Sequence, residues 1–302
     1  MNLINLQNKM MNPKITIFTP TYNRAYILPR LYESLLKQTS KNFEWIVVDD
    51  GSTDQTKSLV EGYLQENKIP IKFFLQENSG KHVAVNKGIG NALGSFFFVL
   101  DSDDYLLENA VEEVLTLIQK IENNPKVAGV TFIRAAENQN LDFYERQGEQ
   151  TICNNFDFIY HYRFTGEMTF VIRTEILQKN LYPQFAGEKF CPESLVYKRI
   201  AKDFDYLFYI QVLALGDYLP DGLTSKYWQL IQKSPKTCMI FYEELLKNPK
   251  IPEQTKKNAA KIFIELAFSQ PKKELLKNLG RIPNRYRISA IKNKFLKKWN
   301  KK

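Results

Sequence analysis

The chain has 302 residues, 44% of them apolar, which is enough for one large α/β domain with an appendage or for two modest domains. Its three cysteines, Cys153, Cys191 and Cys238, are widely spaced and odd in number. They therefore match neither a disulfide framework nor a zinc site, and they suit a reducing compartment. We expect no secretion signal and no membrane span, because residues 1–13 are polar and no apolar run approaches about 20 residues.

The formal charge of +9 is unevenly distributed along the chain. Residues 226–302 contain 20 basic and 5 acidic residues, a charge of +15, so the remainder carries −6. Such asymmetry indicates an anionic partner surface, either a membrane or a nucleic acid. We expect a flexible N-terminus over residues 1–13, an α/β domain over 14–225 and a helical basic C-terminal region over 226–302.

Strand and helix patterns alternate four times in the first half of the chain. The strands are expected at 14–20, 43–48, 71–75 and 96–100, and the helices at 26–38, 55–66, 82–92 and 107–121. This alternation predicts a doubly wound, mainly parallel sheet flanked by helices. Further strands are expected at 127–134, 167–172 and 206–215, a helix at 194–202 and helices from 221 onward, while 143–150 is ambiguous.

An acidic cluster follows the fourth strand. The apolar run 96–100 leads directly into Asp101, Asp103 and Asp104. Like charges crowded together favour a nearby cation, and oxygen ligands suit Mg²⁺ or Mn²⁺. The alternative is an acidic turn that caps the next helix, a role that we expect for Asp104.

Polar clusters also follow the other three strands, at residues 21–23, 49–50 and 78–81. In open parallel sheets, ligands bind beyond the carboxyl ends of the strands. Four clusters at four strand ends therefore predict one shared site, and this convergence favours the metal over simple helix capping.

These clusters resemble the motifs of the family 2 glycosyltransferases, which have the GT-A fold. The resemblance rests on Thr19-Pro20-Thr21-Tyr22-Asn23-Arg24, Val47-Val48-Asp49-Asp50-Gly51-Ser52-Thr53-Asp54, Asn86-Lys87-Gly88-Ile89 and Leu100-Asp101-Ser102-Asp103-Asp104, in that order. It covers roughly residues 14–225. The additional motifs 77–82, 187–190 and 218–224 resemble bacterial members that build surface or capsular polysaccharides.

The resemblance implies a nucleotide site for a UDP-sugar donor. Tyr22 and the Pro20 backbone would hold the uracil, for which an aromatic face suits stacking. Asp50 would accept a hydrogen bond from the base, with Asp49 beside it and Arg24 in the same site.

The resemblance likewise implies a diphosphate and metal site. Lys81 and Asn86 would lie near the nucleotide or its diphosphate. Asp101, Ser102 and Asp103 form the DxD motif, with Asp103 expected as a direct ligand of Mn²⁺ or Mg²⁺ and Asp101 nearer the ribose or the metal. The metal would offset the charge that grows on the UDP leaving group.

The family is inverting and needs a base, usually the aspartate of a Glu-Asp pair six residues before an arginine. Here Glu193 stands six residues before Arg199, and Pro192 replaces the first acid of the pair. Glu188 in the same loop is the alternative base. A third possibility is that Glu193 only stabilises the start of the next helix.

Residues 281–302 place apolar and aromatic side chains at helical spacing among lysines and arginines. This pattern is typical of an interfacial helix on an anionic membrane, and the alternative is a helix packed on the catalytic domain with a solvated basic face. Nucleic acid is not expected, because the aromatic residues lie on the apolar face. We expect a cytoplasmic protein, peripheral on the inner face of the cell membrane.

The sequence thus predicts a metal-dependent, inverting hexosyl- or N-acetylhexosaminyltransferase. Its acceptor would be a polysaccharide or a lipid-linked glycan in bacterial surface glycan synthesis. One alternative is a sugar-nucleotide nucleotidyltransferase, which would need a glycine-rich basic loop where this chain has Pro20-Thr21-Tyr22-Asn23. The other is a catalytically silent GT-A scaffold, an alternative that Pro192 leaves open.

Overall fold

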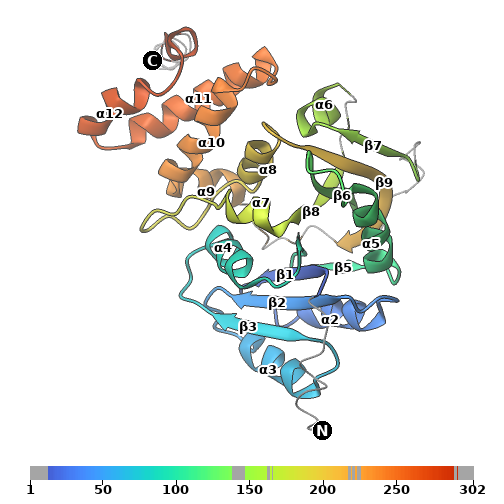
Figure 1. Ribbon diagram of the computed structural model, residues 1–302. Coiled ribbons are helices and arrows are strands. Elements are labelled where there is room, and N and C mark those ends of the chain that lie inside the picture. The colour runs from blue at the N-terminus through green and yellow to red at the C-terminus, as the bar shows by residue number, and fades with distance from the viewer. Residues whose placement is uncertain are drawn as a thin grey trace.

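The computed structural model describes residues 13–137, 147–161, 164, 166–216, 219, 222, 226–288 and 291. Within these ranges the fold is built on a nine-stranded sheet in the order β3-β2-β1-β4-β8-β6-β9-β5, with β7 paired to β9 (Figure 1). The strands are β1 (Ile15–Thr21), β2 (Phe43–Asp49), β3 (Ile71–Leu75), β4 (Phe96–Val99), β5 (Asp104–Leu106), β6 (Val127–Ala135), β7 (Gln150–Cys153), β8 (Glu167–Arg173) and β9 (Asp205–Gly216).

The first four strands form the parallel sheet that the alternating pattern predicts. Strands β3, β2, β1 and β4 are neighbours and all run parallel. The second half is mixed, because β8 runs antiparallel to both β4 and β6 while β6 and β9 are parallel. The expected mainly parallel α/β fold is confirmed, with antiparallel pairs confined to β5, β7 and β8.

Helices cover both faces of the sheet, and alternate strand residues point to opposite faces. They are α2 (Leu28–Lys37), α3 (Thr56–Glu66), α4 (Lys81–Asn91), α5 (Ala110–Ile121), α6 (Asn155–Tyr160), α7 (Thr174–Gln178), α8 (Ser194–Ile200), α9 (Tyr227–Lys233), α10 (Pro235–Lys247), α11 (Glu253–Ser269) and α12 (Lys272–Leu279). On β4, Phe96 and Phe98 join the apolar cluster under α2, α3 and α5, whereas Phe97 joins the cluster under α4, α7 and α8.

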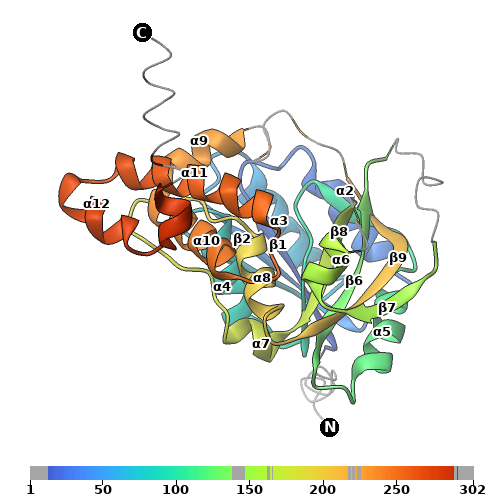
Figure 2. The same ribbon diagram turned by 90° about the horizontal axis from the view of Figure 1, so that it is seen from above.

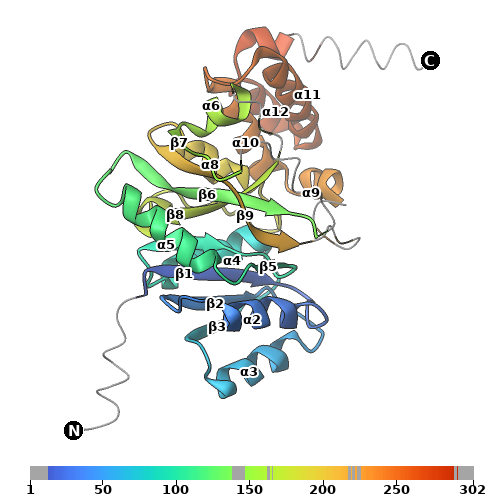
Figure 3. The same cartoon turned by 90° about the vertical axis from the view of Figure 1, so that its right-hand side faces the viewer.

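The C-terminal helices share a core with the sheet. Figures 1 and 2 show α9 to α12 on the side of the molecule that also carries α4, opposite α5, and Figure 3 shows α11 and α12 far from α3. Buried residues of α10 and α11, among them Phe241 and Phe263, belong to the same apolar cluster as Phe18 of β1. The predicted boundary at residue 225 lies outside the described residues. None of the helices in the described ranges is long and apolar enough to cross a membrane.

Three short elements were not predicted: β5, β7 and α6. A strand of three or four residues, or a helix of six, is too short to show a hydrophobic period. The expectation that Asp104 caps the next helix is wrong. Asp104 lies in β5 and accepts hydrogen bonds from Arg134 at 2.8 and 3.0 Å, and α5 begins only after Asn109.

Helix α4 packs closely on β1 through a glycine. A Cβ atom on Gly88 would lie 2.2 Å from the Phe18 ring, whereas a Cβ atom on Gly90, two residues later, would meet nothing within 4 Å. Close packing therefore requires glycine at 88 and not at 90.

We predict opposite effects for alanine at these two positions. Gly88→Ala should lower the free energy of unfolding by about 1–3 kcal/mol through overpacking. Gly90→Ala should raise it by about 0.5–1 kcal/mol, because glycine is unfavourable inside a helix. Urea unfolding of the two variants beside the parent measures both effects. Equal effects of the same sign would contradict the packing of α4 on Phe18.

Candidate functional site

The carboxyl ends of β1, β2 and β4 meet at one edge of the sheet. Thr21 pairs with Asp49 in the register of β1 and β2, and the Thr21 carbonyl accepts the Asp50 N–H at 2.8 Å. Beyond β4, the Leu100 N–H donates to the Phe18 carbonyl of β1 at 2.9 Å. The polar residues that follow these strands therefore emerge side by side.

The loop after β1 presents Tyr22 outward. Asn23 adopts a left-handed φ of 53°, its N–H donates to Ser52 Oγ at 2.8 Å, and its Oδ1 accepts the Thr53 N–H at 2.8 Å. These bonds attach the loop to the one that follows β2. Pro20 stays buried within β1, while Tyr22 remains 45% exposed and can offer its ring to a flat ligand.

Asp49, the last residue of β2, and Asp50, which follows it, are both buried and hydrogen-bonded. Asp49 Oδ1 accepts the Ser52 N–H at 2.9 Å. Asp50 accepts three hydrogen bonds, from Gln76 Nε2 at 2.7 Å, the Ser79 N–H at 2.7 Å and the Gly80 N–H at 2.8 Å. The Asp50 carboxylate thus holds the loop that leads into α4, and its contact with a nucleotide base stays a prediction.

Lys81, the first residue of α4, joins two carboxylates from distant parts of the chain. Its Nζ lies 2.7 Å from the Asp101 carboxylate and 2.5 Å from Glu193 Oε1. Burial alone would lower the pKa of Lys81, but the two carboxylates outweigh it and raise this pKa well above its ordinary value. Lys81 is therefore a fixed positive charge in the site.

The DxD residues fit a metal ion in part. Both Asp101 carboxylate oxygens lie 2.7 Å from Lys81 Nζ, so a metal ion would share this carboxylate with the ammonium. Desolvation and then the Asp101 charge raise the pKa of Asp103, which a bound cation would reverse. No cluster of three or more His, Cys, Asp or Glu able to hold a metal occurs within the described ranges. Two carboxylates would thus need diphosphate and water oxygens to complete the shell, the usual arrangement for Mg²⁺.

Basic residues surround the DxD turn. Arg30 Nη2 donates to the Asp103 carbonyl at 2.7 Å, and the charge of Arg24 acts to lower the Asp103 pKa. Ser102 between the two aspartates is buried. Burial and then Asp101 raise the pKa of Asp104 to about 7 despite its bonds to Arg134. The Arg134–Asp104 pair was missed from the sequence, because nothing in either segment marks the other as its partner.

The two candidate bases have different surroundings. Glu193 precedes α8, makes no capping hydrogen bond to the helix, and turns its carboxylate to Lys81. Its side chain is 46% exposed, and desolvation by the surrounding protein raises its pKa, with Lys81 opposing the rise.

Glu188 is buried, and its carboxylate accepts the N–H groups of Lys236 and Thr237, both at 2.8 Å, and the Thr237 hydroxyl at 3.0 Å. It binds the first turn of α10. The structure therefore brings Glu193, and not Glu188, together with Lys81 and Asp101.

The Asn86 side chain of α4 binds the backbone of Tyr182. Its Nδ2 donates to the Tyr182 carbonyl at 2.8 Å, and its Oδ1 accepts the Tyr182 N–H at 2.9 Å. The Asn86 side chain therefore binds both polar backbone groups of Tyr182, and its expected place near the nucleotide or its diphosphate stays a prediction.

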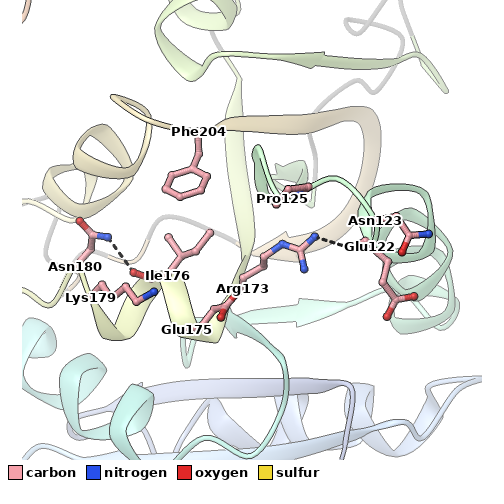
Figure 4. Close-up of a pocket in the computed structure, with 9 residues that line it drawn as sticks. All are labelled: Glu122, Asn123, Pro125, Arg173, Glu175, Ile176, Lys179, Asn180 and Phe204. Atoms are coloured by element: carbon pink, nitrogen blue, oxygen red, sulfur yellow. Dashed lines mark hydrogen bonds between the residues drawn. The ribbon is translucent and has the colours of Figure 1, made fainter.

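A cavity of about 240 Å³ lies elsewhere on the molecule (Figure 4). It is lined by residues that follow α5, residues in and just after α7, and Phe204 before β9, together with Arg173. Arg173 pairs with Phe96 at the start of β4, whereas the DxD turn follows the end of β4. The cavity and the DxD turn therefore lie at opposite ends of this strand. The Arg173 guanidinium donates to backbone carbonyls, including those of Ile121 and Glu122.

Comparison with known proteins identifies the family. Residues 16–180 match the family described as Glycosyl transferase family 2. This match covers more than half of the chain, and the chain belongs to that family.

Among curated relatives, the GalNAc(5)-diNAcBac-PP-undecaprenol beta-1,3-glucosyltransferase of Campylobacter jejuni is 34% identical over 182 residues, 59% of this chain and 57% of the relative. Glycosyltransferase GlyG of Streptococcus pneumoniae is 38% identical over 114 residues, 37% of this chain and 36% of the relative. The chain thus spans about half of the length, or less, of these relatives.

Two solved structures share the fold. S. aureus TarS 1-349 in complex with UDP-GlcNAc matches with a TM-score of 0.63 and 20% identity, covering 90% of this chain and 82% of TarS. The mannosyltransferase PcManGT from Pyrobaculum calidifontis, in complex with GDP-Man and Mn²⁺, matches with a TM-score of 0.56 and 18% identity, covering 90% and 75%.

Proposed function

We propose that this protein is a metal-dependent, inverting glycosyltransferase that moves a hexosyl or N-acetylhexosaminyl group from a UDP-sugar. The acceptor is a polysaccharide or lipid-linked glycan of the bacterial surface. One observation carries the proposal: the Lys81 ammonium touches both Asp101 of the DxD turn and the carboxylate of Glu193. The UDP-GlcNAc complex of TarS and the undecaprenol-linked acceptor in the name of the Campylobacter relative support the donor and acceptor classes.

The donor side uses residues from three strand ends. Tyr22 stacks on the uracil, with Pro20 and Asp49 behind it. Asp103 and Asp101 hold Mn²⁺ or Mg²⁺, which, when bound, supplies Lewis-acid stabilisation of the UDP leaving group. Lys81 adds a positive charge beside the diphosphate, where negative charge develops in the transition state.

The acceptor side uses Glu193. Its carboxylate takes the proton from the attacking hydroxyl, and a raised pKa makes it a stronger base. Because the base must be ionised, the transfer rate should fall as the pH falls through the Glu193 pKa. This acidic limb should lie above the ordinary range of a glutamate.

The first test concerns the metal and the donor. We predict that Asp103→Asn loses Mn²⁺-dependent stabilisation by UDP in thermal unfolding and lowers UDP-sugar turnover by about 100-fold or more. The control is Asp157→Asn. Asp157 lies on α6 and forms an exposed ion pair with Lys250, so this variant removes the same charge away from the site and should behave as the parent. A panel of UDP-, GDP- and dTDP-sugars with Mn²⁺ identifies the donor.

Unchanged turnover in Asp103→Asn would exclude the metal role. A parent protein that binds UDP with Mn²⁺ but turns over no sugar nucleotide with any glycan acceptor would favour the silent scaffold. Formation of a sugar nucleotide from a sugar phosphate and a nucleoside triphosphate would favour the nucleotidyltransferase.

The second test separates the two candidate bases. Glu193→Gln should lower kcat for transfer by about 10²–10⁴-fold, the usual contribution of a general base, with UDP affinity near that of the parent. Glu188→Gln should keep transfer within about tenfold but lower the free energy of unfolding by about 1–3 kcal/mol, because an amide group would face the N–H donors of α10. The reverse pattern would move the base to Glu188.

The C-terminal helices carry an exposed basic surface. On α12, Leu276 is 81% exposed and stands among the exposed lysines Lys272, Lys273 and Lys277. We propose that this face contacts an anionic membrane, which suits a lipid-linked acceptor. Ile282 and Tyr286 are buried in the core. The segment 281–302, expected as an interfacial helix, is thus partly packed on the protein. Its last residues, 292–302, lie outside the described residues.

We predict that Lys272→Glu/Lys273→Glu/Lys277→Glu weakens sedimentation with phosphatidylglycerol vesicles by at least about tenfold, since each lysine near such a surface contributes about 1 kcal/mol. The control is Lys37→Glu/Lys57→Glu/Lys68→Glu, which makes the same charge change on exposed lysines around α2 and α3. Equal sedimentation of the two triple variants would contradict the assignment to α12.

A further inference from the structure

One side chain of α4 binds a backbone residue that lies 96 positions later in the chain. Asn86 donates to the carbonyl and accepts from the N–H of Tyr182, at 2.8 and 2.9 Å. An amide side chain presents one donor and one acceptor in the same plane, so it can pair with both polar groups of one residue as a neighbouring strand would. This clamp fixes the position and direction of the chain at Tyr182.

Tyr182 extends the clamp to the candidate base. Its ring is buried, and its hydroxyl donates to the Glu193 carbonyl at 3.0 Å. Residue 193 is therefore tied to α4 through one buried aromatic ring that cannot reorient without breaking its packing.

The chain between these two residues is held at further points. A Cβ atom on Gly80 would lie 2.0 Å from the Lys189 carbonyl, so this segment passes directly over the first turn of α4. Beyond it, the Phe190 N–H donates to Ser234 Oγ at 3.1 Å, and the Phe190 carbonyl accepts the Thr237 hydroxyl at 2.6 Å. Residues 182–193 are thus fixed between α4 and α10.

Helix α4 consequently meets Glu193 in two ways. Lys81 at its start contacts the carboxylate, and Asn86, five residues further along, holds the backbone through Tyr182. The same Lys81 contacts Asp101. Because a helix is rigid over five residues, α4 sets the distance between the base and the DxD turn.

We propose that Asn86 is a positioning residue that acts through Tyr182 to place Glu193 against Lys81 and Asp101. This role rests on the proposed function of Glu193 as the base. Misplacing a reacting group by about 1 Å can lower a rate by about 100-fold, so the clamp affects catalysis while Asn86 itself touches no substrate.

The test uses two variants with matched controls. Asn86→Asp keeps the acceptor for the Tyr182 N–H but sets a carboxylate oxygen against the Tyr182 carbonyl. Tyr182→Phe keeps the clamp and removes the hydroxyl that donates to the Glu193 carbonyl and also bonds to the Tyr197 side chain. Asn91→Asp makes the same change on an exposed residue of α4, and Tyr32→Phe removes another buried hydroxyl, which is bonded to Glu66 far from the site.

We predict that Asn86→Asp lowers kcat for transfer by about 10–100-fold and Tyr182→Phe by about 3–10-fold, with KM for the donor and UDP affinity within twofold of the parent. The controls should keep the parental kcat. A purely structural role would instead lower UDP affinity and the unfolding temperature in parallel with kcat. That result, or a parental kcat in Asn86→Asp, would overturn the proposal.

A double variant tests whether Asn86 acts through Glu193. In a Glu193→Gln background, Asn86→Asp should cost no further activity, because the group that it positions is already gone. Additive losses would overturn the proposal while leaving Glu193 as the base. Parental activity in Glu193→Gln alone would instead refute the proposed base.

Hydrogen exchange gives a readout that needs no substrate. In Asn86→Asp, amide exchange in peptides covering residues 182–193 should accelerate at least tenfold, with peptides of β1 and β2 unchanged. Exchange at the parental rate would show that Asn86 does not hold this segment, whatever the reaction proves to be.

Discussion

The ammonium of Lys81 is the charge on which the site depends. It lies between Asp101, which follows β4, and Glu193, which precedes α8. Two carboxylates this close would repel each other and lose hydration without a cation, and the Lys81 ammonium between them offsets this repulsion. The helix that carries Lys81 is fixed in turn by Asp50, which binds the two N–H groups just before it. In the proposed function, the donor side and the acceptor side of the site therefore share one support.

The sequence predicts most of what lies around β1 to β4. Their apolar runs, the helical spacings between them and the polar residues at their ends were all visible in a single chain, because each is a local pattern. The resemblance to the family, confirmed by the match over residues 16–180, rests on those same local motifs. What the sequence does not show is pairing at a distance. Nothing in the neighbourhood of Asn86 or Tyr182 marks one as the partner of the other.

The contrast between Glu188 and Glu193 likewise depends on partners that lie far away in the sequence. Both are glutamates in one irregular loop, and spacing to Arg199 was the single local signal that favoured Glu193. The structure adds their partners: backbone N–H groups of α10 for Glu188 and an ammonium of α4 for Glu193. One carboxylate is used to hold the chain together, while the other keeps an exposed face next to a cation.

The apolar cluster that unites the sheet with α10 and α11 limits how this protein can change in evolution. Helix α10 receives Glu188 at its first turn, and its Glu244 binds Arg199 of α8 at 2.8 Å. The C-terminal helices are consequently not an interchangeable module. A relative that exchanged them for another domain would have to supply new partners for Glu188 and Arg199, or lose the contacts that hold the chain on both sides of Glu193.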